Sequence, residues 1–190
     1  YKLAPSYKVA VDTPDYVVGM GLTAEAVAKK YNINRQSQDE FSLQSHKKAA
    51  HAIEQGYFKD QIVPVNVTDI SVQNNKRIER PFIMDTDEGV RKDTTLEALA
   101  KLPAVLAMKG YVTAGNSSQT SDGAGFLVIM SEDMVKQLGI NPIGRLVSCS
   151  VAGVDPLYMG IGPCAAIPLA LQQANKTIQD ISLIELNEAF

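Results

Sequence analysis

Apolar and polar positions in the early part of the chain predict two helices. Thr23 is a candidate N-cap for a helix over 24–31, because its hydroxyl suits the free N–H groups of a first turn. Asn34 is a candidate N-cap for a longer helix that ends near residue 55, where Gly56 supplies a left-handed stop. Four residues of the longer helix recur at helical spacing and are expected to form its packed face: Phe41, Ser45, Ala49 and Ile53.

The middle of the chain is mostly polar. Residues 62–67 alternate like a strand, and Pro64 indicates a position at the edge of a sheet. Residues 69–94 carry charges of both signs and are predicted to be a loop-rich surface segment. A short helix is predicted over 95–101, since Pro103 prevents its continuation.

Beyond residue 111 the pattern changes to apolar runs that alternate with helical segments. Helices are predicted over 134–138, ended by Gly139, and from Pro163 to about residue 174. Three apolar runs are predicted to be strands: 126–130, part of 143–154, and 181–186. The alternation predicts a layered α/β core.

Composition and charge narrow the class of protein. The 190 residues are 45% hydrophobic and 21% charged, as in a globular protein, and the formal net charge of -3 makes nucleic acid a poor partner. No apolar run reaches the roughly 18–20 residues that cross a bilayer, and residues 1–5 lack the features of a signal peptide. Two cysteines are too few for a disulfide framework. We therefore expect a soluble intracellular protein.

Four stretches combine glycine with polar residues and are candidates for chemistry: 19–25, 113–125, 153–163 and 187–190. One reading of the third stretch is a nucleotide-binding turn, in which "GIGP" at the start of a helix binds phosphate. The strand–GxGxxG–helix context and the later acidic residue of such sites are missing, which disfavours that reading.

Taken in order, these stretches resemble a known family. "MGLTAE" (20–25), "TAGNSSQTSDGA" (113–124), "AGVDP" (152–156), "MGIGP" (159–163) and "NEAF" (187–190) are similar to the successive motifs of thiolases, the acetyl-CoA acyltransferases. "GNSSQ" at 115–119 resembles the degradative 3-ketoacyl-CoA thiolases of fatty acid β-oxidation more than the biosynthetic type.

The resemblance implies a fold and a domain layout. Thiolases have an αβαβα layered fold with two similar halves and an inserted helix- and loop-rich domain. Residues 1–110 are expected to form that insertion over the coenzyme A (CoA) site, 111–139 the last strand region of the N-terminal half, and 140–190 the start of the C-terminal half. The chain would then be an internal part of a longer protein.

The resemblance also implies a reaction, in which a cysteine thiolate takes the acyl group of a 3-ketoacyl-CoA and passes it to CoA. Asn187 matches the thiolase asparagine that holds an oxyanion-hole water, although an asparagine that caps a turn remains an alternative. The nucleophilic Cys, the His and the second Cys of the family match nothing in these residues. Cys149 and Cys164 are expected to be buried and structural, and His46 and His51 to face solvent.

Five residues match positions that contact CoA or the acyl group in thiolases: Met20, Arg91, Ser118, Met159 and Phe190. A turn serine and a solvated loop charge remain the alternatives for Ser118 and Arg91. Gly19 and Leu106 stand where some members carry His and an aromatic residue, which favours a longer or more varied acyl group.

The resulting expectation is a thiolase that cleaves 3-ketoacyl-CoA or runs the reverse condensation. It would use CoA as a substrate, hold no permanent cofactor or metal, and assemble as a homodimer or homotetramer. The expected compartment is the cytoplasm of a bacterium, or the peroxisome or mitochondrion of a eukaryote. The alternative is a non-catalytic acyl-CoA-binding protein on the same fold.

Overall fold

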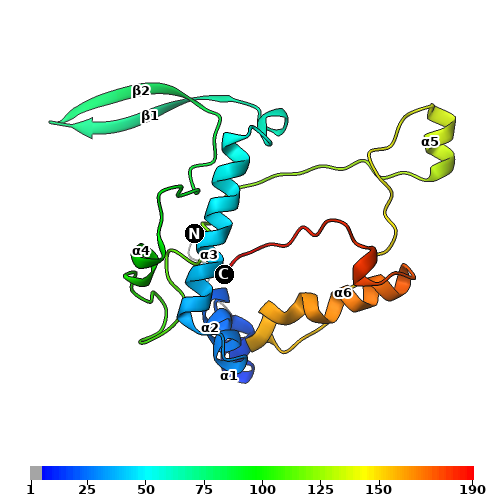
Figure 1. Cartoon of the computed structure of the whole chain (residues 1–190), viewed down its shortest axis with the longest axis horizontal. Helices are drawn as coiled ribbons and strands as arrows, with labels where there is room; N and C mark the ends of the chain where they lie inside the picture. The colour runs from blue at the N-terminus through cyan, green and yellow to red at the C-terminus, as the bar shows by residue number, and fades with distance from the viewer. Residues whose placement is uncertain (1–5) are drawn as a thin grey trace. The chain divides into compact units, whose positions relative to one another are not determined.

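The computed structural model describes residues 6–190, so the predicted absence of a signal peptide at 1–5 lies outside the described residues. The chain forms two compact units, whose helices and strands are labelled in Figure 1. The first unit contains residues 1–33, 104–112 and 117–190, and the second contains 34–103 and 113–116. No helix among the described residues combines the length and the apolar character that crossing a membrane requires.

The second unit is built on the long helix α3 (Arg35–Glu54). The Asn34 side chain accepts the N–H of Ser37 at 2.8 Å and Gly56 has φ 71°, so both predicted ends of this helix are confirmed. The predicted packed face is wrong at Phe41, which is 58% exposed. The buried residue of α3 is Asp39, because its ion pair with Arg35 faces the helix α4 (Leu96–Ala100).

A hairpin of strands β1 (Val65–Gln73) and β2 (Lys76–Met84) follows the short 3-10 helix η2 (Lys59–Gln61). The strands pair antiparallel from Val65 opposite Met84 to Gln73 opposite Lys76. Asn74 and Asn75 have φ of 50° and 58°, as a two-residue type I′ turn requires. The predicted strand therefore begins later and is longer, and the loop prediction is wrong over 69–84. The overlooked signal was Asn-Asn between two alternating segments.

The first unit contains most of the short helices. They are α1 (Tyr7–Asp12), η1 (Pro14–Val17), α2 (Met20–Lys30), α5 (Glu132–Leu138), η3 (Pro156–Ile161), α6 (Gly162–Gln173) and η4 (Ile178–Asp180). Gly139 ends α5 with φ 63°, and Pro163 lies in the first turn of α6, so both predictions are confirmed. The predicted cap of α2 is wrong. Gly19 occupies the N-cap, and the buried Thr23 donates its hydroxyl to the Met20 carbonyl inside the helix at 2.6 Å.

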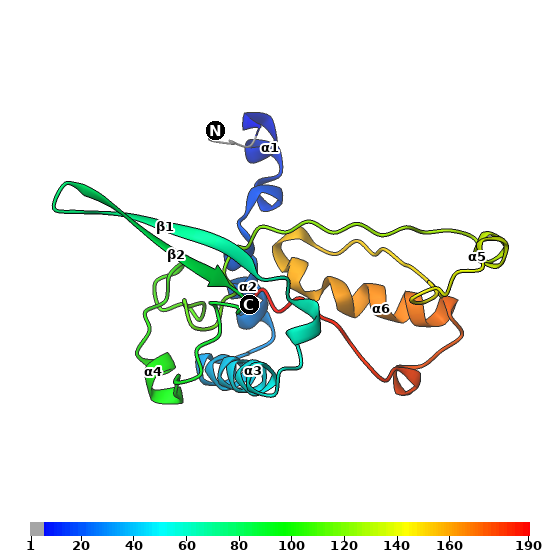
Figure 2. The same ribbon diagram turned by 90° about the horizontal axis from the view of Figure 1, so that it is seen from above.

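The three predicted strands beyond residue 120 pair with no other strand among the described residues. Residues 120–130, 144–154 and 183–190 instead follow an extended course without strand arrows (Figures 1 and 2). Phe126 is 97% exposed, so the apolar side chain there is uncovered among the described residues. The segments form no strand because a strand needs a hydrogen-bonded neighbour, and the described residues supply none for them.

The extended segment 144–154 is attached to α6 through alternate residues. The Ser148 hydroxyl donates to the Ala170 carbonyl at 2.9 Å, and the Ser150 hydroxyl donates to the Ala166 carbonyl at 2.6 Å. Because successive side chains of an extended segment point to opposite sides, Cys149 points away from α6 and is exposed. Cys164 is two residues from Ala166, on another side of the helix, and is also exposed. The prediction that both cysteines are buried is therefore wrong.

Candidate functional site

Three segments that are distant in sequence meet at the first turn of α2. A Cβ atom added at Gly21 would overlap the side chain of Leu106 and lie 3.5 Å from Cε1 of Phe190. Gly21 is buried, whereas Met20, Leu106 and Phe190 are each about half exposed, at 48%, 47% and 46%. The helix start thus carries an apolar surface that is only partly covered. Met20 and Phe190, two of the predicted site residues, both belong to it.

Ser118 lies next to the same surface. Its N–H donates to the carbonyl of Ala189 at 3.0 Å, which joins the glycine- and serine-rich stretch to the end of "NEAF". The Ser118 side chain is exposed, and its hydroxyl makes only a long contact of 3.4 Å with the Gln119 carbonyl. The backbone is therefore fixed, while the side chain is exposed.

Met159 lies on η3, which packs on α2. Asp155 caps η3 by accepting the N–H of Leu157 at 3.0 Å. The ammonium of Lys30 lies 3.7 Å from the centre of the Tyr158 ring, a cation–π contact that holds η3 against α2. Met159 itself is 42% exposed, so its thioether is accessible.

A carboxylate on α2 holds the loop that carries Leu106. Glu25 accepts the N–H of Tyr111 on both of its oxygens and the N–H of Val112 on Oε1, all at 2.9 Å. The Val105 N–H donates to the Val112 carbonyl at 3.0 Å and closes the base of the loop. The sequence around Glu25 does not indicate these contacts, because the partners lie more than 80 positions away.

Asn187 is exposed on the extended stretch that ends at Phe190. The Ala189 carbonyl of that stretch is bonded to Ser118, so the backbone is fixed two residues beyond Asn187. The first unit therefore brings the segments of Met20, Ser118 and Phe190 together and packs the element that carries Met159 on α2. Asn187 belongs to the same stretch as Phe190.

Arg91 belongs to the second unit, where its side chain is exposed. Its backbone N–H donates to Nδ1 of His46 at 3.2 Å. His46 is therefore half-buried, and the prediction that it faces solvent is wrong, because the loop around Arg91 covers it. The same prediction holds for His51, which is exposed and lies edge-on to the Tyr57 ring at 6.2 Å.

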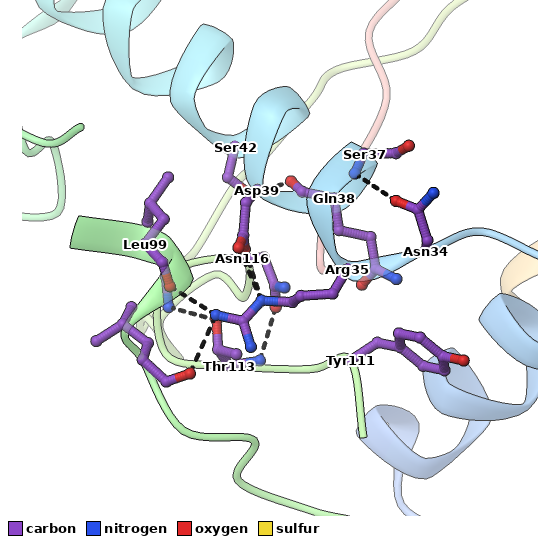
Figure 3. A network of polar contacts seen from close by, with 12 residues as sticks. Asn34, Arg35, Ser37, Gln38, Asp39, Ser42, Leu99, Tyr111, Thr113 and Asn116 are labelled. Atoms are coloured by element: carbon purple, nitrogen blue, oxygen red, sulfur yellow. Dashed lines mark hydrogen bonds and ion pairs between the residues drawn. The ribbon is translucent and has the colours of Figure 1, made fainter. Parts of the chain in front are cut away.

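The second unit contains a group of polar contacts near the start of the "TAGNSS" stretch (Figure 3). The Arg35 guanidinium donates to both oxygens of Asp39, at 2.9 and 2.8 Å, and to the carbonyls of Leu99 and Leu102, at 2.6 and 3.0 Å. In the same unit the buried Asn116 side chain accepts the N–H of the buried Thr113 at 2.7 Å. The Thr113–Asn116 bond fixes the turn at the start of the stretch.

The titratable groups with resolved shifts belong to helix starts. The pKa of Glu97 is lowered by its own backbone N–H and by the Thr95 hydroxyl. The pKa of Asp180 is lowered by the backbone N–H and then the hydroxyl of Thr177. The described residues also contain no group of His, Cys, Asp and Glu side chains arranged to hold a metal ion.

Two protein-family models match successive parts of the chain. Residues 7–133 match the model of the thiolase N-terminal domain, and residues 140–190 match that of the thiolase C-terminal domain. The chain is 48% identical over 187 residues to a 3-ketoacyl-CoA thiolase of Bacillus subtilis. The aligned region covers 98% of this chain and 48% of that relative.

Solved structures give the same result. Human mitochondrial 3-ketoacyl-CoA thiolase in complex with CoA is similar at a TM-score of 0.80 and 41% identity, over 96% of this chain and 43% of that one. The dimeric peroxisomal thiolase of Saccharomyces cerevisiae is similar at a TM-score of 0.80 and 32% identity, over 99% of this chain and 46% of that one. The chain thus spans less than half the length of these relatives.

Proposed function

Because this chain belongs to the thiolase family and carries part of the thiolase-like α/β fold, we propose that its protein is a CoA-dependent acyltransferase. It cleaves a 3-ketoacyl-CoA with CoA into acetyl-CoA and a shortened acyl-CoA, or runs the reverse condensation. The observation that carries the proposal is the meeting of "MGLTAE", Ser118 and "NEAF" in one unit. The relatives named above are thiolases, which gives no support to a non-catalytic acyl-CoA-binding protein.

In the proposed reaction a cysteine thiolate attacks the C3 carbonyl of the substrate, and the C2–C3 bond breaks. The electron pair of that bond leaves as the acetyl-CoA enolate and is then protonated, while the acyl thioester on the enzyme passes to the thiol of CoA. We assign none of residues 1–190 as the nucleophile or its base. Asn187 is proposed to hold a water of an oxyanion hole, since an amide can donate to that water while accepting elsewhere.

Binding of CoA and the acyl group is proposed for the exposed residues of the first unit. The exposed hydroxyl of Ser118 and the ring of Phe190 suit the pantetheine arm, and the thioethers of Met20 and Met159 suit a variable acyl chain. Arg91 is proposed to contact the adenine and phosphates, because a planar guanidinium both stacks and pairs with phosphate. CoA is a substrate in this scheme, and no permanent cofactor is required.

For the domain layout we propose that residues 1–110 form the inserted domain over the CoA site. Residues 111–139 would then belong to the N-terminal half of the core, and 140–190 to the C-terminal half. The family-model boundary between residues 133 and 140 is compatible with this division. The proposed compartment is cytoplasmic in a bacterium, and peroxisomal or mitochondrial in a eukaryote.

The proposed activity is tested by thiolysis with the full-length protein. Incubation with acetoacetyl-CoA and CoA should consume the 3-ketoacyl absorbance and produce acetyl-CoA. A series of longer 3-ketoacyl-CoAs then gives the chain-length preference. A folded full-length protein that binds these substrates and turns over none of them would support the binding-protein alternative.

Binding of CoA to the full-length protein should depend on Ser118 and Arg91. Loss of one hydrogen bond in Ser118→Ala should weaken binding by about 0.5–1.5 kcal/mol, and loss of a charged one in Arg91→Ala by about 1.5–3 kcal/mol. Calorimetric titration of CoA measures both effects. His51→Ala is the control and should bind as the wild type does; unchanged affinity in Ser118→Ala and Arg91→Ala would refute these assignments.

The full-length protein is also proposed to be a homodimer or homotetramer. The support for this proposal is that one similar structure, the peroxisomal thiolase of Saccharomyces cerevisiae, is dimeric. Size-exclusion chromatography with light scattering should therefore give at least twice the monomer mass. A monomer at micromolar concentration contradicts the proposal.

A further inference from the structure

We propose that Glu25 is a positioning residue for the acyl site. Its carboxylate fixes the loop 104–112 so that Leu106 is held against Gly21, which Phe190 also approaches. The inference rests on the proposed function, because it treats Leu106, together with Met20 on the same apolar surface, as a wall of the acyl pocket. All of the residues involved belong to the first unit.

The contact between Glu25 and the loop is charge-assisted and directional. Two consecutive N–H groups, those of Tyr111 and Val112, donate to one carboxylate at 2.9 Å. Hydrogen bonds to an ionised acceptor are about twice as strong as those between neutral groups. Val112 is only 2% exposed, so water cannot readily replace the carboxylate if it is removed. The carboxylate therefore fixes the end of the loop, alongside the bond between Val105 and Val112 at its base.

Gly110 shows how closely the loop approaches the carboxylate. A Cβ atom added there would overlap Oε1 of Glu25 and lie 2.9 Å from the Ala107 carbonyl oxygen. The same carbonyl accepts the Gly110 N–H at 2.9 Å, which makes a tight turn between Leu106 and Tyr111. A displacement at Tyr111 is therefore transmitted through a short, closed loop to Leu106.

Glu25, which holds the loop, and Gly21, which contacts Leu106, lie on the same face of α2. Gly21 and Glu25 are four residues apart, which places them one above the other along the helix. Glu25 holds the end of the loop, and Gly21 provides the space that the Leu106 side chain fills. One helix thus sets the position of Leu106 by two contacts, a polar one and an apolar one.

The functional consequence is a dependence of acyl-chain selectivity on Glu25. If the loop is released, Leu106 no longer holds its place against Gly21, and a small acyl group loses the wall that orients it. A misplacement of about 1 Å reduces turnover by up to about 100-fold when it disturbs orientation. A long acyl chain makes further contacts and should lose less. Ser118 is not part of this loop, so its contribution to CoA binding should stay near the wild-type value.

The test uses the full-length protein with Glu25→Ala, Glu25→Gln and Leu106→Ala. For each, kcat and KM are measured with acetoacetyl-CoA and with a long-chain 3-ketoacyl-CoA. The ratio of the two kcat/KM values should shift about 10-fold or more towards the long substrate in Glu25→Ala and Leu106→Ala. Glu25→Gln keeps an oxygen that accepts both N–H groups and should recover part of the ratio. Glu97→Gln, an exposed acid on α4, should leave the ratio unchanged.

Two further measurements separate the possible outcomes. Hydrogen exchange of the Tyr111 and Val112 amides should accelerate in Glu25→Ala, and the effects of Glu25→Ala and Leu106→Ala on the ratio should be non-additive. An unchanged ratio, or an equal loss for both substrates, would overturn the positioning role while the proposed activity stands. If the wild type cleaves neither substrate, the proposed function is wrong and the positioning role falls with it. If Glu25→Ala does not fold, Glu25→Gln and Leu106→Ala still decide the question.

Discussion

Replacing Arg35 by alanine is expected to lower the free energy of unfolding by about 3–5 kcal/mol, the cost of breaking a buried ion pair by removing one partner. Asp39 is 1% exposed, and the Arg35 guanidinium donates to both of its oxygens. The same guanidinium donates to the carbonyls of Leu99 and Leu102 at the end of α4. The substitution therefore leaves a buried charge and two backbone acceptors without this donor.

The matched control is Arg77→Ala. The Arg77–Glu79 pair is equally short, at 2.7 Å, but its side chains are 64% and 54% exposed. Exposed pairs contribute about 0–1 kcal/mol, so this variant should unfold nearly as the wild type does. Arg35→Lys should fall between the two, because one ammonium cannot reproduce the fork of a guanidinium. Urea unfolding of the full-length protein, followed by circular dichroism, measures all three. Equal midpoints for the Arg35→Ala and Arg77→Ala variants would contradict the argument.

Helix ends were the most predictable part of this fold, because their signals lie within a few residues. Asn34, Gly56 and Gly139 each act on backbone groups of their own turn, so the sequence alone indicates them. The same reasoning gave a wrong N-cap at Thr23. Its hydroxyl bonds a carbonyl inside the helix, and the actual N-cap, Gly19, has no side chain to indicate the start.

Pairing between strands was far less predictable. Asn74 and Asn75 between alternating segments indicate the hairpin, but the mixed charges of these segments favoured a loop prediction. The apolar run at 126–130 predicts a strand, but a strand also needs a neighbour to pair with. Whether a neighbour exists is not encoded in the run itself, and Phe126 is exposed here.

In the candidate site, too, local features were predictable from the sequence and long-range contacts were not. Met20, Ser118 and Phe190 were predicted from motifs as site residues, and their segments lie together in the first unit. Glu25 and His46 were missed as contacts because their partners lie 86 and 45 positions away. Long-range contacts of this kind depend on how the segments pack, which no local spacing reveals.

Asn187→Ala in the full-length protein is expected to lower kcat by about 10²–10³-fold, the usual cost of losing one oxyanion-hole donor. The proposed water stabilises charge that develops only in the transition state, so KM should stay nearly unchanged. The backbone near Asn187 is held by the Ala189–Ser118 hydrogen bond, which the substitution does not touch.

Two further variants make this test specific for the amide of Asn187. Asn187→Asp keeps the size of the side chain but its carboxylate cannot donate a hydrogen bond, so it should be as impaired as Asn187→Ala. Glu185→Gln, an exposed change on the same stretch, should retain wild-type kcat. Steady-state kinetics with acetoacetyl-CoA and CoA measure kcat and KM for each. Wild-type kcat with a raised KM in Asn187→Ala would show that Asn187 binds substrate and does not stabilise the transition state.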